Sequence, residues 1–93
     1  MPNQPETTHF TPPRLGIIGG GQLGKMLAQE ARKLSIFVNI LDPSPAPPAR
    51  MVADNHIVGS FFDETKFWDL AACSDIITCE LEDIDTRLLA KIA

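Results

Sequence analysis

A glycine-rich turn is the part of the sequence whose residue types and spacing most clearly suit ligand binding. Residues 19–24 read GGGQLG, in which Gly19, Gly21 and Gly24 have the G-x-G-x-x-G spacing of a dinucleotide-binding loop. Glycines allow a backbone to approach a ligand closely, and the N–H groups that begin a following helix attract anions. We therefore expect Gly19, Gly20 and Gly24 to form a loop against which a ligand can lie.

Two carboxylates, Glu80 and Glu82, follow another apolar run and could meet the same ligand. Together with Gln22 they offer acceptor oxygens, which suit a ligand that carries N–H and O–H donors, such as an amine or a ribose. A pyrophosphate would instead face two carboxylates, and like charges about 5 Å apart cost on the order of 1 kcal/mol or more. These residues therefore favour an aminated sugar phosphate over a dinucleotide.

Two other interpretations stay open. Asp42 follows Gly24 by eighteen residues, close to where dinucleotide-binding domains carry a ribose-binding carboxylate. An NAD(P)-binding half-domain of an oxidoreductase is therefore an alternative, although this aspartate and the proline after it also suit a plain strand-ending turn. In the simplest interpretation, Glu80 and Glu82 are surface charges of a loop and Gln22 only begins a helix.

The apolar pattern alternates between strands and helices. Short β-branched or apolar runs predict strands at 15–18, 36–41, 56–58 and 75–79. Helical periodicity predicts helices from Gln22 to near Ser35, from Asp63 to near Cys73, and from Thr86 onward. The first helix is expected to pack through an apolar face made of Leu23, Met26, Leu27, Ala31 and Leu34.

This order of elements predicts an α/β fold. A β-α-β-β-α-β-α succession is typical of a Rossmann-like parallel sheet, most simply in the strand order 3-2-1-4. Ligands of such sheets bind at the carboxyl ends of the strands where the strand order reverses. In this chain that point lies between the first and fourth strands, so the glycine loop and Glu80 are expected to lie side by side.

The composition indicates one small domain that binds a small molecule. The chain has 93 residues, a net charge of −4 and a pI near 4.9, whereas nucleic acid or an anionic membrane would require a positive face. No apolar stretch approaches the roughly 20 residues of a membrane span. We expect a flexible N-terminal extension at 1–13, a domain at 14–93, a cytoplasmic location, no metal site, and free thiols at Cys73 and Cys79.

Three segments of the chain resemble the N-terminal domain of the carboxyaminoimidazole ribonucleotide synthase family, the ATPase-subunit type of phosphoribosylaminoimidazole carboxylase. They read RLGIIGGGQLGKMLAQEARKL, ILDPSPAPPARMVADNHIV and SDIITCELEDID, and they follow the family's order and spacing from about Arg14 to Ala93. This combination is far more specific than a glycine motif alone. The resemblance implies a pre-ATP-grasp domain, the first of three domains in a ligase of de novo purine biosynthesis.

The resemblance also implies a reaction and a set of site residues. The complete enzyme would use ATP and Mg²⁺ to activate bicarbonate as carboxyphosphate, and would pass the carboxyl group to the amine of aminoimidazole ribonucleotide. By position, the ribonucleotide would contact Gly21, Gln22, Leu23, Glu80 and Glu82. A related family, the formate-dependent glycinamide ribonucleotide transformylases, carries glutamate where Gln22 stands.

The same resemblance implies that the chemistry takes place outside this chain. The ATP-grasp and C-terminal domains, which would hold ATP, Mg²⁺ and bicarbonate, are absent, so no catalytic residue and no independent activity are expected here. The full-length enzyme is expected to be a homodimer. Ser35 stands where the family usually has a helix-capping glycine, and Asp83 where asparagine is common. A last alternative is a non-catalytic interaction domain that packs through Leu88, Leu89 and Ile92.

Overall fold

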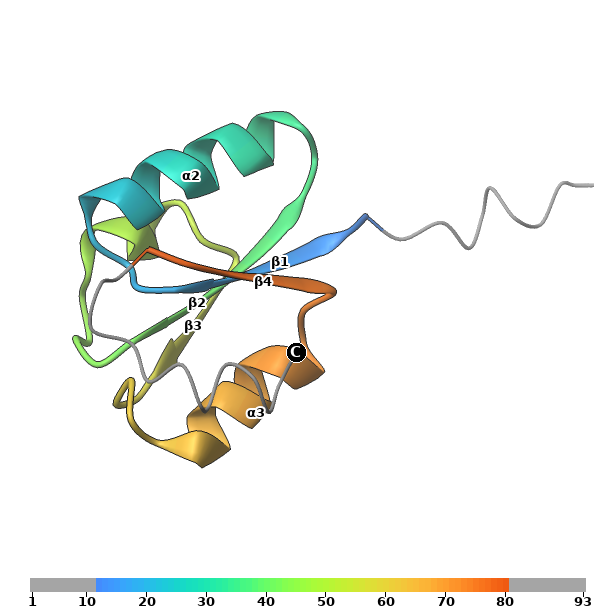
Figure 1. Cartoon of the computed structure of the whole chain (residues 1–93). Coiled ribbons are helices and arrows are strands. Elements are labelled where there is room, and N and C mark those ends of the chain that lie inside the picture. The colour runs from blue at the N-terminus through green and yellow to red at the C-terminus, as the bar shows by residue number, and fades with distance from the viewer. Residues whose placement is uncertain (1–11, 81–93) are drawn as a thin grey trace, which may run out of the picture.

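The structure, a computed structural model, describes residues 12–80 and contains one parallel four-stranded sheet (Figure 1). The strands lie in the order β3-β2-β1-β4, which confirms the predicted order. The strands are β1 (Arg14–Ile18), β2 (Phe37–Asp42), β3 (Asn55–Val58) and β4 (Ile76–Cys79). The helices are α2 (Gln22–Lys33), the short 3₁₀ helix η1 (Pro48–Met51) and α3 (Glu64–Ala72).

Helices α2 and α3 cover opposite faces of the sheet (Figure 1). Neighbouring strand residues alternate between these faces, so Ile17 and Ile40 pack under α2 while Ile18 and Leu41 pack under α3. The α2 layer contains Ile17, Ala28, Ala31, Val38, Ile40 and Ala49, and the α3 layer contains Ile18, Leu41, Phe67 and Leu70. Burial on both faces explains why the central residues of β1 and β2 are apolar at successive positions instead of alternate ones, with Asn39 as a buried polar exception in β2.

The buried face of α2 differs from the predicted one. Leu23, Met26 and Leu34 are 63%, 59% and 73% exposed, so the expectation that they pack on the sheet was wrong. The residues of α2 that are buried are small, and their size lets the helix lie close to the sheet: Gly24, Ala28 and Ala31. The predicted face was right for Ala31 and for Leu27, which is partly buried against the core. Hydrophobic periodicity missed Gly24 and Ala28 because it counts large side chains and gives little weight to glycine and alanine.

The end of α2 requires a left-handed residue, and that residue is Ser35, with a φ of 61°. The N–H of Ile36 donates to the carbonyl of Ala31 (3.0 Å) and the N–H of Ser35 to the carbonyl of Arg32 (3.0 Å). This is the Schellman pattern, in which glycine is usual at the left-handed position. Serine therefore occupies a site whose backbone favours glycine, as the departure from the family pattern suggested.

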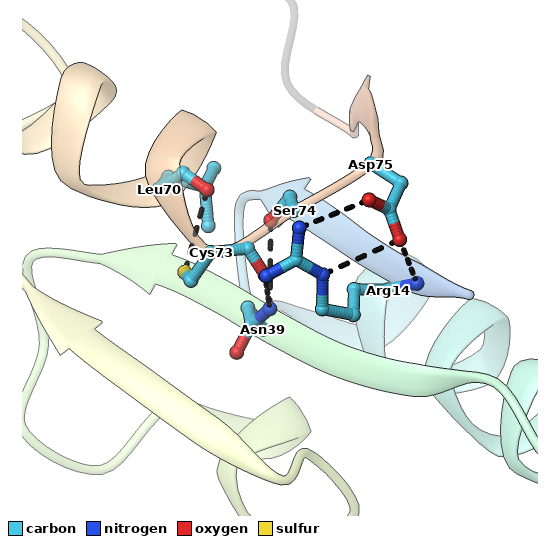
Figure 2. A network of polar contacts seen from close by, with 6 residues as sticks. All are labelled: Arg14, Asn39, Leu70, Cys73, Ser74 and Asp75. Atoms are coloured by element: carbon cyan, nitrogen blue, oxygen red, sulfur yellow. Dashed lines mark hydrogen bonds and ion pairs between the residues drawn. The ribbon is translucent and has the colours of Figure 1, made fainter. Parts of the chain in front are cut away.

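The amino end of β4 is held by polar contacts, shown in Figure 2. The Arg14 guanidinium donates to the Asp75 carboxylate at 3.0 Å, and the Arg14 backbone N–H donates to the same carboxylate at 2.8 Å. Asn39, which is buried in β2, donates through Nδ2 to the Cys73 carbonyl at 2.6 Å. These contacts tie the turn between α3 and β4 to the first two strands and thereby fix the position of the edge strand.

Several expectations concern residues outside the described range: Glu82, Asp83, the helix from Thr86 with Leu88, Leu89 and Ile92, and most of the 1–13 extension. Within residues 12–80, no helix combines the length and the apolar character needed to cross a membrane. Cys73 and Cys79 are both partly buried, and no disulfide joins these two residues.

Candidate functional site

The carboxyl ends of β1 and β4 meet where the strand order reverses. Ile18 pairs with Cys79, so the residues that follow, Gly19 and Glu80, emerge side by side. The Glu80 backbone N–H donates to the Ile18 carbonyl at 3.0 Å and extends the ladder by one residue. Because the helices α2 and α3 lie on opposite faces, they diverge at this point, and the sheet edge between them is the expected place for a ligand.

The glycine loop is held by three hydrogen bonds, two to the end of β2 and one to η1. The Gly19 N–H donates to the Leu41 carbonyl at 2.9 Å, and the Gly20 N–H donates to the Asp42 carboxylate at 2.8 Å. The Ala49 N–H, in η1, donates to the Gly20 carbonyl at 2.8 Å. Gly19 has a φ of 109°, a conformation that L side chains rarely adopt, so a glycine is required at this turn.

The next two glycines of the motif have different physical roles. A Cβ on Gly24 would lie 2.3 Å from the Gly19 carbonyl oxygen, so glycine here allows α2 to begin directly against the loop. A Cβ on Gly21 would have no atom within 4 Å, and the φ of −73° at this residue suits any amino acid. The packing of the described residues therefore explains Gly24 but leaves Gly21 unexplained, whereas close approach of a ligand would explain it.

The start of α2 offers backbone donors at this point. Gly21 is the N-cap and supplies no side-chain cap, and the first turn contains no acidic residue. Gln22 and Leu23, the first two residues of the helix, are exposed. Their side chains and the leading N–H groups can therefore meet a ligand at the same edge as Glu80, which is partly buried. Of the predicted site residues, the structure brings together those of 19–24 and Glu80, and Glu82 lies outside the described range.

Asp42 has a structural role that the sequence indicated only in part. Its Oδ1 accepts from the Ser44 N–H at 2.9 Å, which confirms the strand-ending turn. Its Oδ2 accepts from the Gly20 N–H, a contact between distant parts of the chain that sequence spacing did not predict. Both oxygens therefore accept from the backbone, which gives Asp42 a structural role within the fold.

The resolved pKa shifts belong to groups away from the glycine loop. The Arg14 guanidinium, which donates to Asp75, lowers the pKa of that carboxyl, and the same contact raises the pKa of Arg14. The Thr65 hydroxyl, which donates to Asp63 at the start of α3, lowers the pKa of the Asp63 carboxyl. Residues 12–80 bring no three histidine, cysteine or acidic side chains together as a metal site would require.

Comparison with known proteins identifies the family. A sequence model of the ribonucleotide synthetase preATP-grasp domain matches residues 13–93. The chain belongs to this family. The N5-carboxyaminoimidazole ribonucleotide synthase of Staphylococcus haemolyticus is 45% identical over 78 residues, which cover 84% of this chain and 21% of that protein. The chain thus spans about a fifth of the length of the curated synthases it matches.

Solved structures show the same pre-ATP-grasp fold. The N5-carboxyaminoimidazole synthetase of Staphylococcus aureus, crystallised with ADP, superposes with a TM-score of 0.84 at 44% identity, over 86% of this chain and 21% of that one. The synthase of Aspergillus clavatus, in complex with ADP and 5-aminoimidazole ribonucleotide, gives a TM-score of 0.78 at 40% identity, over 88% and 22%. The family match and these neighbours, all named carboxyaminoimidazole synthases or synthetases, confirm the resemblance and disfavour the oxidoreductase alternative.

Proposed function

We propose that this chain is the N-terminal, substrate-side domain of an ATP-dependent ligase that carboxylates aminoimidazole ribonucleotide with bicarbonate. The observation that carries the proposal is the family match over residues 13–93 together with a glycine loop and Glu80 at one switch point. The Aspergillus clavatus relative, whose structure contains the same ribonucleotide, supports the choice of substrate.

In the proposed site, Gly21 lets the ribonucleotide approach the backbone, and the N–H groups at the start of α2 donate to its oxygens. Gln22 and Glu80 provide acceptors for the amine and hydroxyl donors of the ribonucleotide, since amide and carboxylate oxygens accept such bonds. Leu23, 63% exposed in this chain, covers an apolar part of the ligand, and Glu82 supports the contacts of Glu80. The role of this domain is to bind and orient the amine that receives the carboxyl group.

ATP, Mg²⁺ and bicarbonate belong, in this proposal, to the remaining four-fifths of the enzyme. Bicarbonate takes the terminal phosphoryl group of ATP there, which releases ADP and gives a mixed anhydride with phosphate. The amine held by this domain attacks the carbonyl carbon of the anhydride, phosphate leaves as the C–O bond to it breaks, and the amine gives up a proton. The 93-residue chain alone is therefore expected to release no ADP from ATP when the ribonucleotide and bicarbonate are present.

The test is a comparison of variants in the complete enzyme. Gln22→Ala and Glu80→Ala should each weaken the affinity for aminoimidazole ribonucleotide about tenfold, since each removes a hydrogen bond to a charged or strongly polar group. The affinity for ATP should stay within about twofold of wild type. Lys33→Ala, which removes only an exposed contact to Glu30 (2.9 Å), is the matched control. Unchanged ribonucleotide affinity in both site variants would refute the site.

A further inference from the structure

We propose that Asp42 is a positioning residue for the ribonucleotide: it holds the glycine loop in its binding geometry without touching the ligand. This inference rests on the proposed function, because it assumes that the loop contacts the substrate. The geometric basis is the contact between Asp42 Oδ2 and the Gly20 N–H (2.8 Å, partly buried), which joins residues 22 positions apart. Gly20 immediately precedes Gly21, the residue at which no atom of residues 12–80 accounts for glycine.

The Asp42 carboxylate accepts two hydrogen bonds, one on each oxygen, and a substitution can remove one while keeping the other. Oδ1 accepts from the Ser44 N–H within the turn that ends β2, whereas Oδ2 accepts from the loop. Only a side chain with two acceptor oxygens satisfies both N–H groups at once. An asparagine presents its amide N–H₂ to one of the two donors, so it loses one contact and sets two donors against each other.

Other contacts locate the loop but do not replace this one. The Gly19 N–H and the Gly20 carbonyl are bonded to the Leu41 carbonyl and the Ala49 N–H, so the loop is fixed on both sides of the Gly20 N–H. Without Asp42, the Gly20 N–H is partly buried and unpaired. The peptide group that carries it then lowers its free energy by rotating until the N–H reaches water. Such a rotation turns the following residue, Gly21, out of the position in which it meets the ligand.

The chain contains a matched control, Asp54, whose carboxylate contacts β2 at the opposite end from Asp42. Asp54 Oδ2 accepts from the Val38 N–H in β2 (2.8 Å), and its Oδ1 accepts from Arg32 (2.7 Å). Asp54, like Asp42, therefore has one oxygen on a backbone N–H of another segment and the other on a second donor. It lies at the amino ends of the strands, away from the loop.

The experiment compares Asp42→Asn, Asp42→Ser and Asp54→Asn in the complete enzyme, with steady-state kinetics and thermal unfolding. A serine can keep the turn with the Ser44 N–H but is too short to reach the loop, so it preserves folding while removing the clamp. We expect KM for aminoimidazole ribonucleotide to rise about tenfold in both Asp42 variants, with KM for ATP unchanged. Asp54→Asn should lower the midpoint of thermal unfolding and leave both KM values at wild type.

Each outcome has one meaning. A wild-type enzyme that does not carboxylate the ribonucleotide refutes the proposed function, independently of Asp42. If the wild type is active and the Asp42 variants keep its KM for the ribonucleotide, the positioning role is refuted. An equal rise of that KM in Asp54→Asn would also refute it, because the effect would then follow from lost stability alone. Faster amide exchange at Gly20 in Asp42→Ser, but not in Asp54→Asn, is the expected structural signature.

Discussion

Gly24 and Gly21, three residues apart, are predicted to respond differently to the same substitution: the first mainly in stability, the second mainly in ligand binding. In Gly24→Ala the new Cβ would lie 2.3 Å from the Gly19 carbonyl oxygen, more than 1 Å inside an ordinary contact. Overpacking of this kind costs about 1–3 kcal/mol, and alanine regains up to about 1 kcal/mol of helix propensity. We therefore expect Gly24→Ala to lower the free energy of unfolding by about 1–2 kcal/mol.

In Gly21→Ala the Cβ enters open space, and only the small preference for glycine over alanine at an N-cap is lost. The free energy of unfolding should fall by no more than about 0.5–1 kcal/mol. The new methyl group nevertheless stands where the ribonucleotide is proposed to approach the backbone. Its affinity for the complete enzyme should therefore fall about tenfold or more, as expected when a ligand must give up close contact.

The assays are urea unfolding followed by circular dichroism for stability, and calorimetric titration of the complete enzyme with aminoimidazole ribonucleotide for binding. If Gly24→Ala is as stable as wild type, the close approach of α2 to the loop is wrong. If Gly21→Ala binds the ribonucleotide with wild-type affinity, the loop does not meet the ligand there.

Three further predictions concern the scaffold. Ser35→Gly should raise the free energy of unfolding by about 0.5–1 kcal/mol, because glycine adopts a φ of 61° without strain; a loss of stability in urea unfolding would contradict this. Asp63→Ala should lower the free energy of unfolding by about 1 kcal/mol, because the cap on the Thr65 N–H is lost. Asp63→Asn should lower it by less, since asparagine can also cap, and equal losses in the two variants would contradict the capping role. The Asp75 pKa is lowered in the folded state, so its stabilising contribution is present above the pKa of the unfolded chain. That contribution is lost as pH falls through the pKa of the folded state. Asp75→Asn should therefore lose less stability than wild type between about pH 5 and pH 2. Equal slopes of the free energy of unfolding against pH in the two proteins would refute this.

The sheet and its order could be predicted from the sequence because the signals are local. The strands β1 and β2 are mostly apolar runs, interrupted in β2 only by Asn39, and Asp63 lies directly before a helical pattern, where an N-cap is expected. The βαβ connection then restricts the topology to very few arrangements. The meeting of the glycine loop with Glu80 follows from that topology alone, before any side chain is placed.

Two features could not be predicted, because they depend on distances that only the folded chain defines. The buried strip of α2 includes Gly24 and Ala28 beside the predicted Ala31, since the helix lies too close to the sheet for larger residues. The contact of Asp42 with the Gly20 N–H joins two turns that are distant in sequence, and no periodicity or motif reports on it.

The measurement that tests the central claim most directly is a crystal structure of the complete enzyme with aminoimidazole ribonucleotide bound. The account predicts that the ribonucleotide lies over Gly21, with its polar atoms about 3 Å from the Gln22 and Glu80 side chains and from the N–H groups that begin α2. A ribonucleotide bound elsewhere, with the edge between β1 and β4 holding only solvent, would contradict it.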